Sequence, residues 1–546
     1  MPIAEFSNGR LRSVIGCFGE QLPVDALRFF EDLGYQIISF GDAELSDTAK
    51  LAITDSVIFS QSEQKPTRIF DELSRYAKKL LAHDCRIYLR VAQPEVNSDK
   101  MRTIAVNAID TLELPSSGLS DNESVSLGFW FKEHKLTAFA PFVHLCGRPN
   151  DWREIAQTIS NNPAGNAPNF AMKVDATDGN GTQIDLTEEQ MLLTRRAFWN
   201  CAAVHLVGMA DGLSGVPAFR AYVELAGGLP GKWPYLYFVK IGSRQKIATE
   251  YRGYQANAQE YIPYHLGPRL RQDRCGLGAS EGIIVGDYVS GSESLRDCAK
   301  DGRAAAAIGN LFNSTLWAWR QVATQKQRSI PDYLEHLFPN AIPAHREDYI
   351  RQFGTLMPLS EMKALFMACV SHPVLTGPIH GDLHATNVLV RASDAIVIDF
   401  EKVSSDMPLV YDAASLEGGL LIDGFIGDHR TPLSWFASIE QLYDEAAFGE
   451  DVVPCHPKDK SAWYFDCVRQ IRIHARQMEC NTGQYATALA LALIKKACND
   501  NDFRVTGESK SNPNTRISRE HLRAAAYVLA ERILKKMSNP SNLRSI

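Results

Sequence analysis

The stretch Pro378–Glu401 reads PIHGDLHATNVLVRASDAIVIDFE, and its order of apolar, glycine and charged residues decides the fold of the larger part of the chain. An apolar segment leads into a loop that carries Asp382, and Asn387 follows in the same loop. Two short apolar segments come next. They predict antiparallel strands joined by a four-residue turn, at Val388–Val390 and Ala395–Ile398.

The outer ends of such a hairpin lie side by side, so the prediction brings Asn387 next to Asp399, which directly follows the second strand. A paired amide and carboxylate suit Mg²⁺, which takes one or two such protein oxygens and completes its octahedron with phosphate and water. Asp382 lies within reach of this pair, as a base for a hydroxyl nucleophile. The stretch therefore predicts metal-dependent chemistry on a hydroxyl group.

The pattern H-G-D-L-H-x-x-N followed by I-D-F-E resembles the catalytic-loop signature of the aminoglycoside phosphotransferase and choline kinase group, which belongs to the protein-kinase-like superfamily. The resemblance extends over about residues 190–440. It implies that Asp382 is the catalytic base and that Asn387 and Asp399 bind the metal. It also implies a supporting role for His384 near the transferred phosphate and a structural role for Asp412.

A kinase-like fold needs a strand-rich lobe before this stretch. Residues 207–223 predict a strand, a turn of small residues and a second strand, and small residues let backbone N–H groups approach phosphate. The next strand, Tyr235–Ile241, carries Lys240, which the resemblance makes the lysine that contacts the nucleotide phosphates; a solvated strand face is the alternative. The turn residues predicted to contact phosphate are Gly212, Ser214 and Gly215, and an ordinary hairpin that carries two glycines is the alternative.

A helix predicted over 247–260 follows and carries Glu250 in its first turn. The resemblance makes Glu250 the ion-pair partner of Lys240, with Glu260 as the second choice and an exposed helix face as the alternative. The last strand of the lobe, predicted within 282–291, leads into a hinge whose backbone groups would hold adenine. The hinge residues expected there are Asp287, Tyr288 and Val289.

The first 115 residues alternate short apolar strands with amphipathic helices, which is typical of βαβ units and a parallel sheet. The alternation predicts a small doubly wound α/β domain of the flavodoxin or receiver type. A receiver would have its phosphate-accepting Asp at the end of the third strand, where this chain has Phe59-Ser60, so the likeness to a receiver is incomplete. We expect a regulatory or adaptor domain and not a catalytic one. The strands are predicted at Arg12–Gly19, Tyr35–Gly41, Ser56–Ser60 and Cys85–Ala92.

The predicted fold class is thus an α+β bilobal protein-kinase-like fold, with a β-rich N-lobe and a helical C-lobe, preceded by the α/β domain. Thr187 and Gln190 predict a capping box at the first helix of the N-lobe. The predicted divisions are 1–115 for the α/β domain, 116–185 for a β-containing connecting segment, 186–290 for the N-lobe and 291–546 for the C-lobe.

The composition narrows the class of protein further. Over 546 residues, 57 Lys and Arg stand against 64 Asp and Glu, a formal charge of −7, which argues against nucleic-acid or acidic-membrane binding. No secretory signal and no apolar run long enough to span a membrane are visible. The 11 cysteines form no C-x-x-C pair and are expected to be reduced thiols, so we expect a cytoplasmic protein.

These features predict an enzyme, an ATP- and Mg-dependent phosphotransferase that moves the γ-phosphoryl group to a hydroxyl of a small molecule or a protein. The extra N-terminal domain favours a regulatory, signalling or conflict-system context, with a protein partner bound through that domain. The main alternative is a nucleotide-binding scaffold or partner-activated switch of the pseudokinase type, without intrinsic turnover. Nucleotidyl transfer is a third possibility, although it usually accompanies an altered site.

The acceptor is not identified by the sequence. In aminoglycoside kinases the C-terminal helices supply acidic residues for cationic substrates. The corresponding part of this chain has an acidic run that a solvated helix face explains equally well: Glu440, Asp444, Glu445, Glu450 and Asp451.

Overall fold

The protein is described from a computed structural model of the whole chain. The chain divides into two compact units: residues 1–248 with 270–288, and residues 249–269 with 289–546. The described residues are 14–19, 22–33, 35–47, 50–51, 54–60, 72–73, 75–80, 83, 85–90, 116–117, 143–146, 152–161, 168–209, 217–226, 235–277, 281–444, 448, 460–499 and 517–538.

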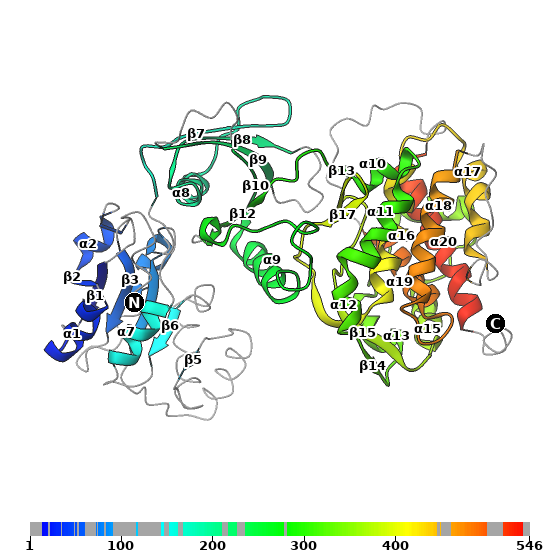
Figure 1. Ribbon diagram of the computed structural model, residues 1–546. Helices are drawn as coiled ribbons and strands as arrows, with labels where there is room; N and C mark the ends of the chain where they lie inside the picture. Colours follow the sequence, from blue (N-terminus) through cyan, green and yellow to red (C-terminus); the bar gives the residue numbers. More distant parts are fainter. Residues whose placement is uncertain are drawn as a thin grey trace. The chain divides into compact units, whose positions relative to one another are not determined.

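The first sheet of the first unit is parallel throughout, with the order β2-β1-β3-β4-β6-β5 (Figure 1). Apart from the short edge strand β5, this is the flavodoxin-like order of a doubly wound sheet. The predicted parallel α/β architecture is therefore confirmed. The strands are β1 Val14–Gly19, β2 Gln36–Phe40, β3 Thr54–Ser60, β4 Arg86–Arg90, β5 Ser116–Ser117 and β6 Val143–Cys146.

Every residue of β3 is buried, as in parallel sheets that are covered on both faces. On one face, α1 (Val24–Asp32) and α7 (Trp152–Asn161) pack their apolar side chains onto β1 and β3. The short α2 (Asp42–Ser46) follows β2. Strands β5 and β6 pair within this sheet and α7 packs on it, so the sheet continues past residue 115, where the sequence predicts the end of the α/β domain. Short edge strands carry too little periodicity to be assigned to their sheet from sequence.

The second sheet of the first unit forms the β-rich lobe, with the order β11-β12-β10-β9-β8-β7. All its neighbours are antiparallel except β7 and β8. Helix α8 (Glu188–Ala197) covers one face, and its predicted capping box between Thr187 and Gln190 is confirmed. The strands are β7 Lys173–Thr177, β8 Cys201–Gly208, β9 Ala218–Leu225, β10 Tyr235–Ser243, β11 Gly276–Leu277 and β12 Glu281–Asp287, with the 3₁₀ turn η3 at Gln272–Arg274.

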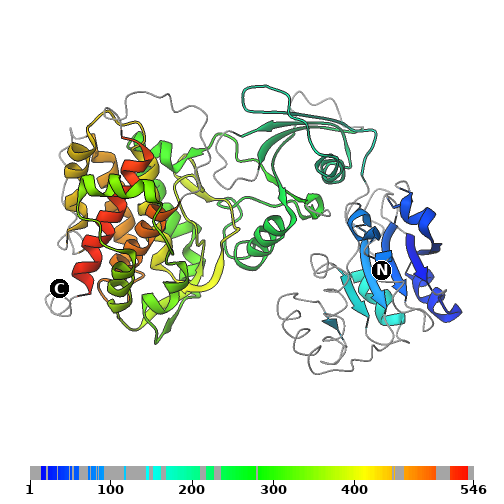
Figure 2. The ribbon, with the colours of Figure 1, turned by 180° about the vertical axis from the view of Figure 1, so that it is seen from behind.

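The second unit is mainly helical, as predicted for the C-lobe (Figures 1 and 2). Helix α9 (Arg244–Asn257) begins in the first unit and continues into the second. The other helices are α10 Leu295–Lys300, α11 Ala304–Asn310, α12 Trp317–Gln321, α13 Ile330–Leu334, α14 Glu347–Phe353, α15 Leu359–Ala368, α16 Val410–Gly424, α17 Pro432–Ile439, α18 Ala462–Arg476, α19 Gln484–Cys498 and α20 Arg519–Met537, with short turns η4 Leu311–Thr315, η5 Glu335–Leu337, η6 Ala344–Arg346 and η7 Glu440–Tyr443.

The core of the second unit is built by α16, α19 and α20, which pack against one another and are buried along most of their length. Two three-stranded sheets, β13-β16-β17 and β14-β15-β18, carry the catalytic-loop stretch. Across the described residues, none of the helices has the length and apolar character needed to cross a membrane. The strands are β13 Glu293–Ser294, β14 Thr324–Lys326, β15 Val374–Ile379, β16 Val388–Arg391, β17 Asp394–Val397 and β18 Ser404–Pro408.

Candidate active site

The loop after β15 is held in a conformation that favours glycine. Gly381 has a φ of +75°, and a Cβ added to it would lie 2.2 Å from the carbonyl oxygen of Lys402. Glycine adopts this left-handed conformation without a steric cost. The glycine of the H-G-D sequence is thus required where the chain turns to present Asp382.

A buried carboxylate on α16 fixes the same loop. Asp412 accepts hydrogen bonds from the backbone N–H groups of His380 at 2.7 Å and Gly381 at 2.9 Å. Burial raises the pKa of this carboxyl, and His380 together with the two N–H donors offsets the rise only in part. The His380 ring also lies 2.9 Å from the carbonyl oxygen of Ile398 through Nε2. Asp412 therefore has the structural role that the resemblance implied.

The predicted hairpin is confirmed, and it brings Asn387 beside Asp399. Strands β16 and β17 are antiparallel, and the N–H of Ile398 donates to the carbonyl of Asn387 at 2.9 Å just beyond the last strand pair. The turn is shorter than predicted, because Arg391 and Asp394 still pair and leave two residues between the strands. Asp399 has a φ of +67°, an unfavourable value for a residue with a Cβ. Such backbone strain gathers at functional sites.

The residues at this hairpin end fit a magnesium ion. The amide nitrogen of Asn387 donates to the backbone carbonyl of Asp382 at 3.1 Å, so its amide oxygen is the atom left for a ligand. Within the described part of the chain, no group of three or more His, Cys, Asp or Glu is placed to hold a metal. Two protein oxygens are what a Mg²⁺ ion needs when phosphates and water complete its shell. Asn387 and Asp399 are therefore the candidate ligands.

The environment of Asp382 favours the ionised form of its carboxylate at neutral pH. Burial raises its pKa, but the positive charges of Lys496 and Lys495, with contributions from His384 and His380, bring the net pKa below the usual range. Among the described residues it forms no hydrogen bond or ion pair. A carboxylate that is ionised and unpaired at neutral pH is able to accept a proton from a hydroxyl group.

His384 is neutral at physiological pH. Burial and the nearby Lys496 lower its pKa to about 4, and Asp382 and Asp423 oppose this only in part. Its Nδ1 is hydrogen-bonded to the hydroxyl of Thr386 at 2.8 Å. The ring therefore offers a hydrogen bond and not a charge to its surroundings.

In the first unit, Lys240 is buried and not on a solvated strand face. It lies on the interior strand β10, between Ala218 of β9 and Ile284 of β12, and is 4% exposed. Val239 and Ile241 on either side of it pack into the core under α8, so Lys240 faces the opposite side of the sheet. The predicted phosphate-binding residues Gly212, Ser214 and Gly215 lie outside the described residues.

Glu250 lies on α9 and is 6% exposed, so an exposed helix face is excluded for it. Because α9 begins at Arg244, Glu250 is in the second turn and not the first, and Glu260 lies beyond the helix end. Lys240 belongs to the first unit and Glu250 to the second. The ion pair between them stays a prediction.

The part of α9 in the second unit packs onto the segment that carries Asp399. A Cβ on Gly253 would lie 2.5 Å from the carbonyl oxygen of Phe400, so the helix approaches this segment closely. The Phe400 ring lies between Tyr254, at 5.6 Å between ring centroids, and His380, at 5.8 Å. This stack connects the helix of Glu250 with both halves of the catalytic-loop stretch.

The predicted hinge residues lie at the end of β12, whose last residue is Asp287, and directly after it. The carboxylate of Asp287 accepts a hydrogen bond from Arg271 at 2.7 Å, and the Arg220 guanidinium lies 4.9 Å from the ring centre of Tyr288. The carbonyl of Val289 accepts from the Ser292 hydroxyl at 2.7 Å. Their role in holding adenine stays a prediction.

Two basic residues that lie close to the loop of Asp382 were not identified from the sequence. Lys495 and Lys496 lie in the last turn of α19, more than 100 residues after the loop. The only signal was a pair of charges at the end of an otherwise apolar helix, and such a pair is also typical of a helix C-terminus exposed to water. Their position beside the loop is a result of tertiary packing.

The acidic run expected to attract a cationic substrate is partly used inside the protein. Glu440 pairs with Arg532 at 2.7 Å and Asp444 with Lys536 at 3.7 Å. Glu445, Glu450 and Asp451 lie outside the described residues. The described part of the run is therefore explained by its ion pairs.

The Gly381→Ala substitution tests the geometry of the loop. For the phosphotransferase activity that the sequence predicts, we expect ADP formation to fall at least about tenfold, because a left-handed alanine costs ~1–2 kcal/mol and its Cβ would also displace Lys402. The matched control is Gly302→Ala, since Gly302 has a similar φ of +73° with nothing within 4 Å of the added Cβ. Initial rates of ADP release measure both variants. Equal losses in the two variants would contradict the special role of the Gly381 contact.

Part of the chain matches known protein families. Residues 237–418, about a third of the chain, match the model of the phosphotransferase enzyme family, which confirms the predicted resemblance. Residues 357–495 match a second family, described as ternary complex associated domain 9. No curated protein matches the sequence significantly.

Several solved structures of kinases resemble the chain at low identity. A choline/ethanolamine kinase family protein from Mesorhizobium loti is 14% identical, with 62% of this chain and 90% of that chain covered and a TM-score of 0.31. A thermostable mutant of aminoglycoside phosphotransferase APH(4)-Ia, in a ternary complex with ADP and hygromycin B, is 12% identical, with 61% and 94% covered and a TM-score of 0.33. Plasmodium vivax ethanolamine kinase is 11% identical, with 63% and 83% covered and a TM-score of 0.28. Similarity at this level does not identify an acceptor for this chain.

Proposed function

We propose that the protein is an ATP- and Mg-dependent phosphotransferase that transfers the γ-phosphoryl group to a hydroxyl of a small molecule. One observation carries the proposal: the hairpin end holds Asn387 beside Asp399, and the preceding loop presents the Asp382 carboxylate, which forms no hydrogen bond or ion pair with the described residues. The match of residues 237–418 to a phosphotransferase family supports it. The choice of ATP follows from the kinase-like catalytic loop, and ADP is bound in the APH(4)-Ia complex compared above.

In the proposed reaction, Asp382 orients the acceptor hydroxyl and takes its proton as the new oxygen–phosphorus bond forms and the bond from the γ-phosphorus to the β-phosphate oxygen of ATP breaks. ADP is the leaving group. Catalysis of this type depends on positioning, and the positioning of Asp382 comes from Gly381 and from the two hydrogen bonds that Asp412 accepts. His384 provides a neutral hydrogen-bonding group next to the base.

Asn387 and Asp399 would hold Mg²⁺, which when bound supplies positive charge to the transferred phosphoryl group. Lys240 would contact the nucleotide phosphates and Glu250 would position it. The backbone of Asp287, Tyr288 and Val289 would bind adenine, and the turn of Gly212, Ser214 and Gly215 would contact phosphate. The regulatory context and a protein partner for the N-terminal domain stay predictions from the sequence.

The product of ATP consumption tests the proposal. Purified protein is incubated with ATP and Mg²⁺, with and without pools of hydroxylated small molecules, and both ADP and AMP are quantified. We expect acceptor-dependent ADP without AMP, and its loss in Asp399→Ala and after magnesium is chelated. AMP release would instead indicate nucleotidyl transfer. Nucleotide binding without turnover under any of these conditions would favour the scaffold alternative.

A further inference from the structure

Two lysines of α19, Lys495 and Lys496, lie close to the loop that carries Asp382. Lys495 donates a hydrogen bond from Nζ to the hydroxyl of Tyr411 at 3.2 Å, and its ammonium lies 5.8 Å from the centre of that ring. Tyr411 directly precedes Asp412, which holds the catalytic loop. Lys495 is thus fixed to the element that supports the loop.

The side chain of Lys496 also extends toward the catalytic loop, and it passes over Gly418 and Gly419 of α16. A Cβ on Gly418 would lie 3.7 and 3.8 Å from Cδ and Cε of Lys496, and one on Gly419 would lie 3.8 Å from Cε. The same Cβ on Gly419 would lie 2.9 Å from Cβ of His384. The lysine stem therefore crosses α16 next to His384, and among the described residues its ammonium has no hydrogen bond or ion pair.

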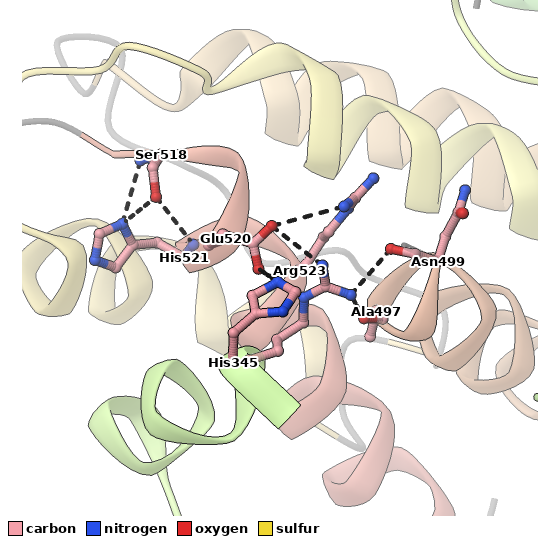
Figure 3. A network of polar contacts seen from close by, with 8 residues as sticks. His345, Ala497, Asn499, Ser518, Glu520, His521 and Arg523 are labelled. Atoms are coloured by element: carbon pink, nitrogen blue, oxygen red, sulfur yellow. Dashed lines mark hydrogen bonds and ion pairs between the residues drawn. The ribbon is translucent and has the colours of Figure 1, made fainter. Parts of the chain in front are cut away.

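The last turn of α19, which carries both lysines, is held rigidly. The carbonyls of Ala497 and Asn499 accept hydrogen bonds from the fully buried Arg346 at 2.5 and 3.0 Å. Arg346 also pairs with Glu520 at 2.8 Å, and Figure 3 shows Glu520 beside Ala497 and Asn499 at this helix end. A charged pair on such a fixed turn is preorganised for a ligand.

In another pair of adjacent lysines, both ammonium groups form ion pairs with carboxylates. Lys535 and Lys536, in the last turn of α20, pair with Glu531 at 2.5 Å and with Asp444 at 3.7 Å. The pair on α19 differs, because the ammonium of Lys496 is left without a partner and that of Lys495 bonds only a hydroxyl among the described residues. The carboxylates whose charge acts on His384, beside the Lys496 stem, are those of Asp382 and Asp423. The carboxylate of Asp412 is bound to backbone N–H groups, and Asp399 lies at the hairpin end that holds the candidate metal ligands.

We propose that the acceptor of the phosphoryl group is an anionic hydroxyl compound, whose phosphate or carboxylate binds Lys495 and Lys496. An acceptor hydroxyl has to lie within hydrogen-bond distance of the Asp382 carboxylate, so the groups around this carboxylate also surround the acceptor. The metal candidates face the backbone of Asp382 through Asn387, whereas the stem of Lys496 lies next to His384, two residues after Asp382. Lysine is a suitable partner for phosphate and carboxylate. This inference rests on the proposed function and is opposite in sign to the cationic substrates considered from the sequence.

Binding of inorganic phosphate tests the lysine site without any turnover. Protein saturated with a non-hydrolysable ATP analogue and Mg²⁺ is titrated with inorganic phosphate by calorimetry. We expect binding that weakens at least tenfold in the double variant Lys495→Gln, Lys496→Gln and is unchanged in the matched control Lys535→Gln, Lys536→Gln. The affinity for the ATP analogue is measured in parallel and is expected to be the same in all three proteins.

The proposal is overturned if phosphate does not bind, or if it binds the α19 double variant as tightly as the wild type. It is also overturned if the α19 double variant loses affinity for the ATP analogue, because the lysines would then bind the ATP phosphates. A second arm compares ADP formation with glycerol 3-phosphate, glycerate, glycerol and choline. Stimulation by the phosphate or the carboxylate member supports the proposal and identifies the anion, whereas stimulation by choline overturns it. If phosphate binds at the lysines but no compound yields ADP, the anion site stands and the phosphotransferase proposal fails.

Discussion

Replacing Asp382 with asparagine is expected to lower acceptor-dependent ADP formation by about 10²–10⁴-fold, the range typical for loss of a general base. Asparagine has nearly the same shape but does not accept the proton of the acceptor hydroxyl. The hydrogen bond from Asn387 goes to the backbone carbonyl of residue 382, so it survives the substitution. The metal-ligand pair and the loop therefore stay in place, and the loss is expected in the rate and not in nucleotide affinity.

Initial rates of ADP release and calorimetric affinities for an ATP analogue measure these two effects separately. The matched control is Asp406→Asn, an exposed aspartate on β18 of the same unit. We expect wild-type rates for this control. A rate for Asp382→Asn within a factor of about three of the wild type would remove Asp382 from its role as base.

The second large effect concerns stability. Arg472 of α18 and Glu417 of α16 form a buried ion pair with two hydrogen bonds of 2.7 and 3.0 Å, and Glu417 also accepts from the Tyr485 hydroxyl at 2.6 Å. Arg472→Met leaves the Glu417 carboxylate buried without its cation. Removing one partner of such a pair typically costs about 3–5 kcal/mol. We expect the melting temperature of the second unit to fall on the order of 10 °C.

The double variant Glu417→Gln, Arg472→Met separates the cost of an unpaired charge from the cost of lost packing. Removing both charges is expected to recover most of the stability, because a buried ion pair gains little over neutral side chains of similar size. Thermal unfolding followed by near-UV circular dichroism and calorimetry gives the four melting temperatures of the cycle. The double variant could instead be as unstable as Arg472→Met. Packing of the guanidinium against Tyr443 and Phe448 would then contribute more to stability than the ion pair does, and the ion-pair interpretation would be wrong.

Part of the candidate site was predictable because its chemistry lies within a few dozen residues. The apolar segments 388–390 and 395–398 have the length and composition of paired strands, and a hairpin brings its two ends together wherever it lies in a fold. Asn387 and Asp399 could therefore be placed side by side from sequence. The shorter turn could not be predicted, because Ala392 adopts a positive φ that its residue type does not favour.

The boundary of the α/β domain was not predictable in the same way. Strands β5 and β6 join the first sheet although they follow β4 at a distance along the chain. A two-residue or four-residue strand has too few alternating positions to indicate its partner. Only the completed sheet, with α7 covering it, identifies the domain to which these residues belong.

The sequence by itself determined the parallel alternation of the first domain and the catalytic-loop hairpin, because each depends on residues that lie near one another in the chain. The tertiary structure alone decided that Lys495 and Lys496 lie against Tyr411 and α16, close to the loop of Asp382, and that Arg472 is buried against Glu417. From sequence alone, a charged residue near a helix end that faces water cannot be distinguished from one that faces a buried carboxylate. The difference comes from packing α16, α18 and α19 together, since burial strengthens charge interactions that water would otherwise screen.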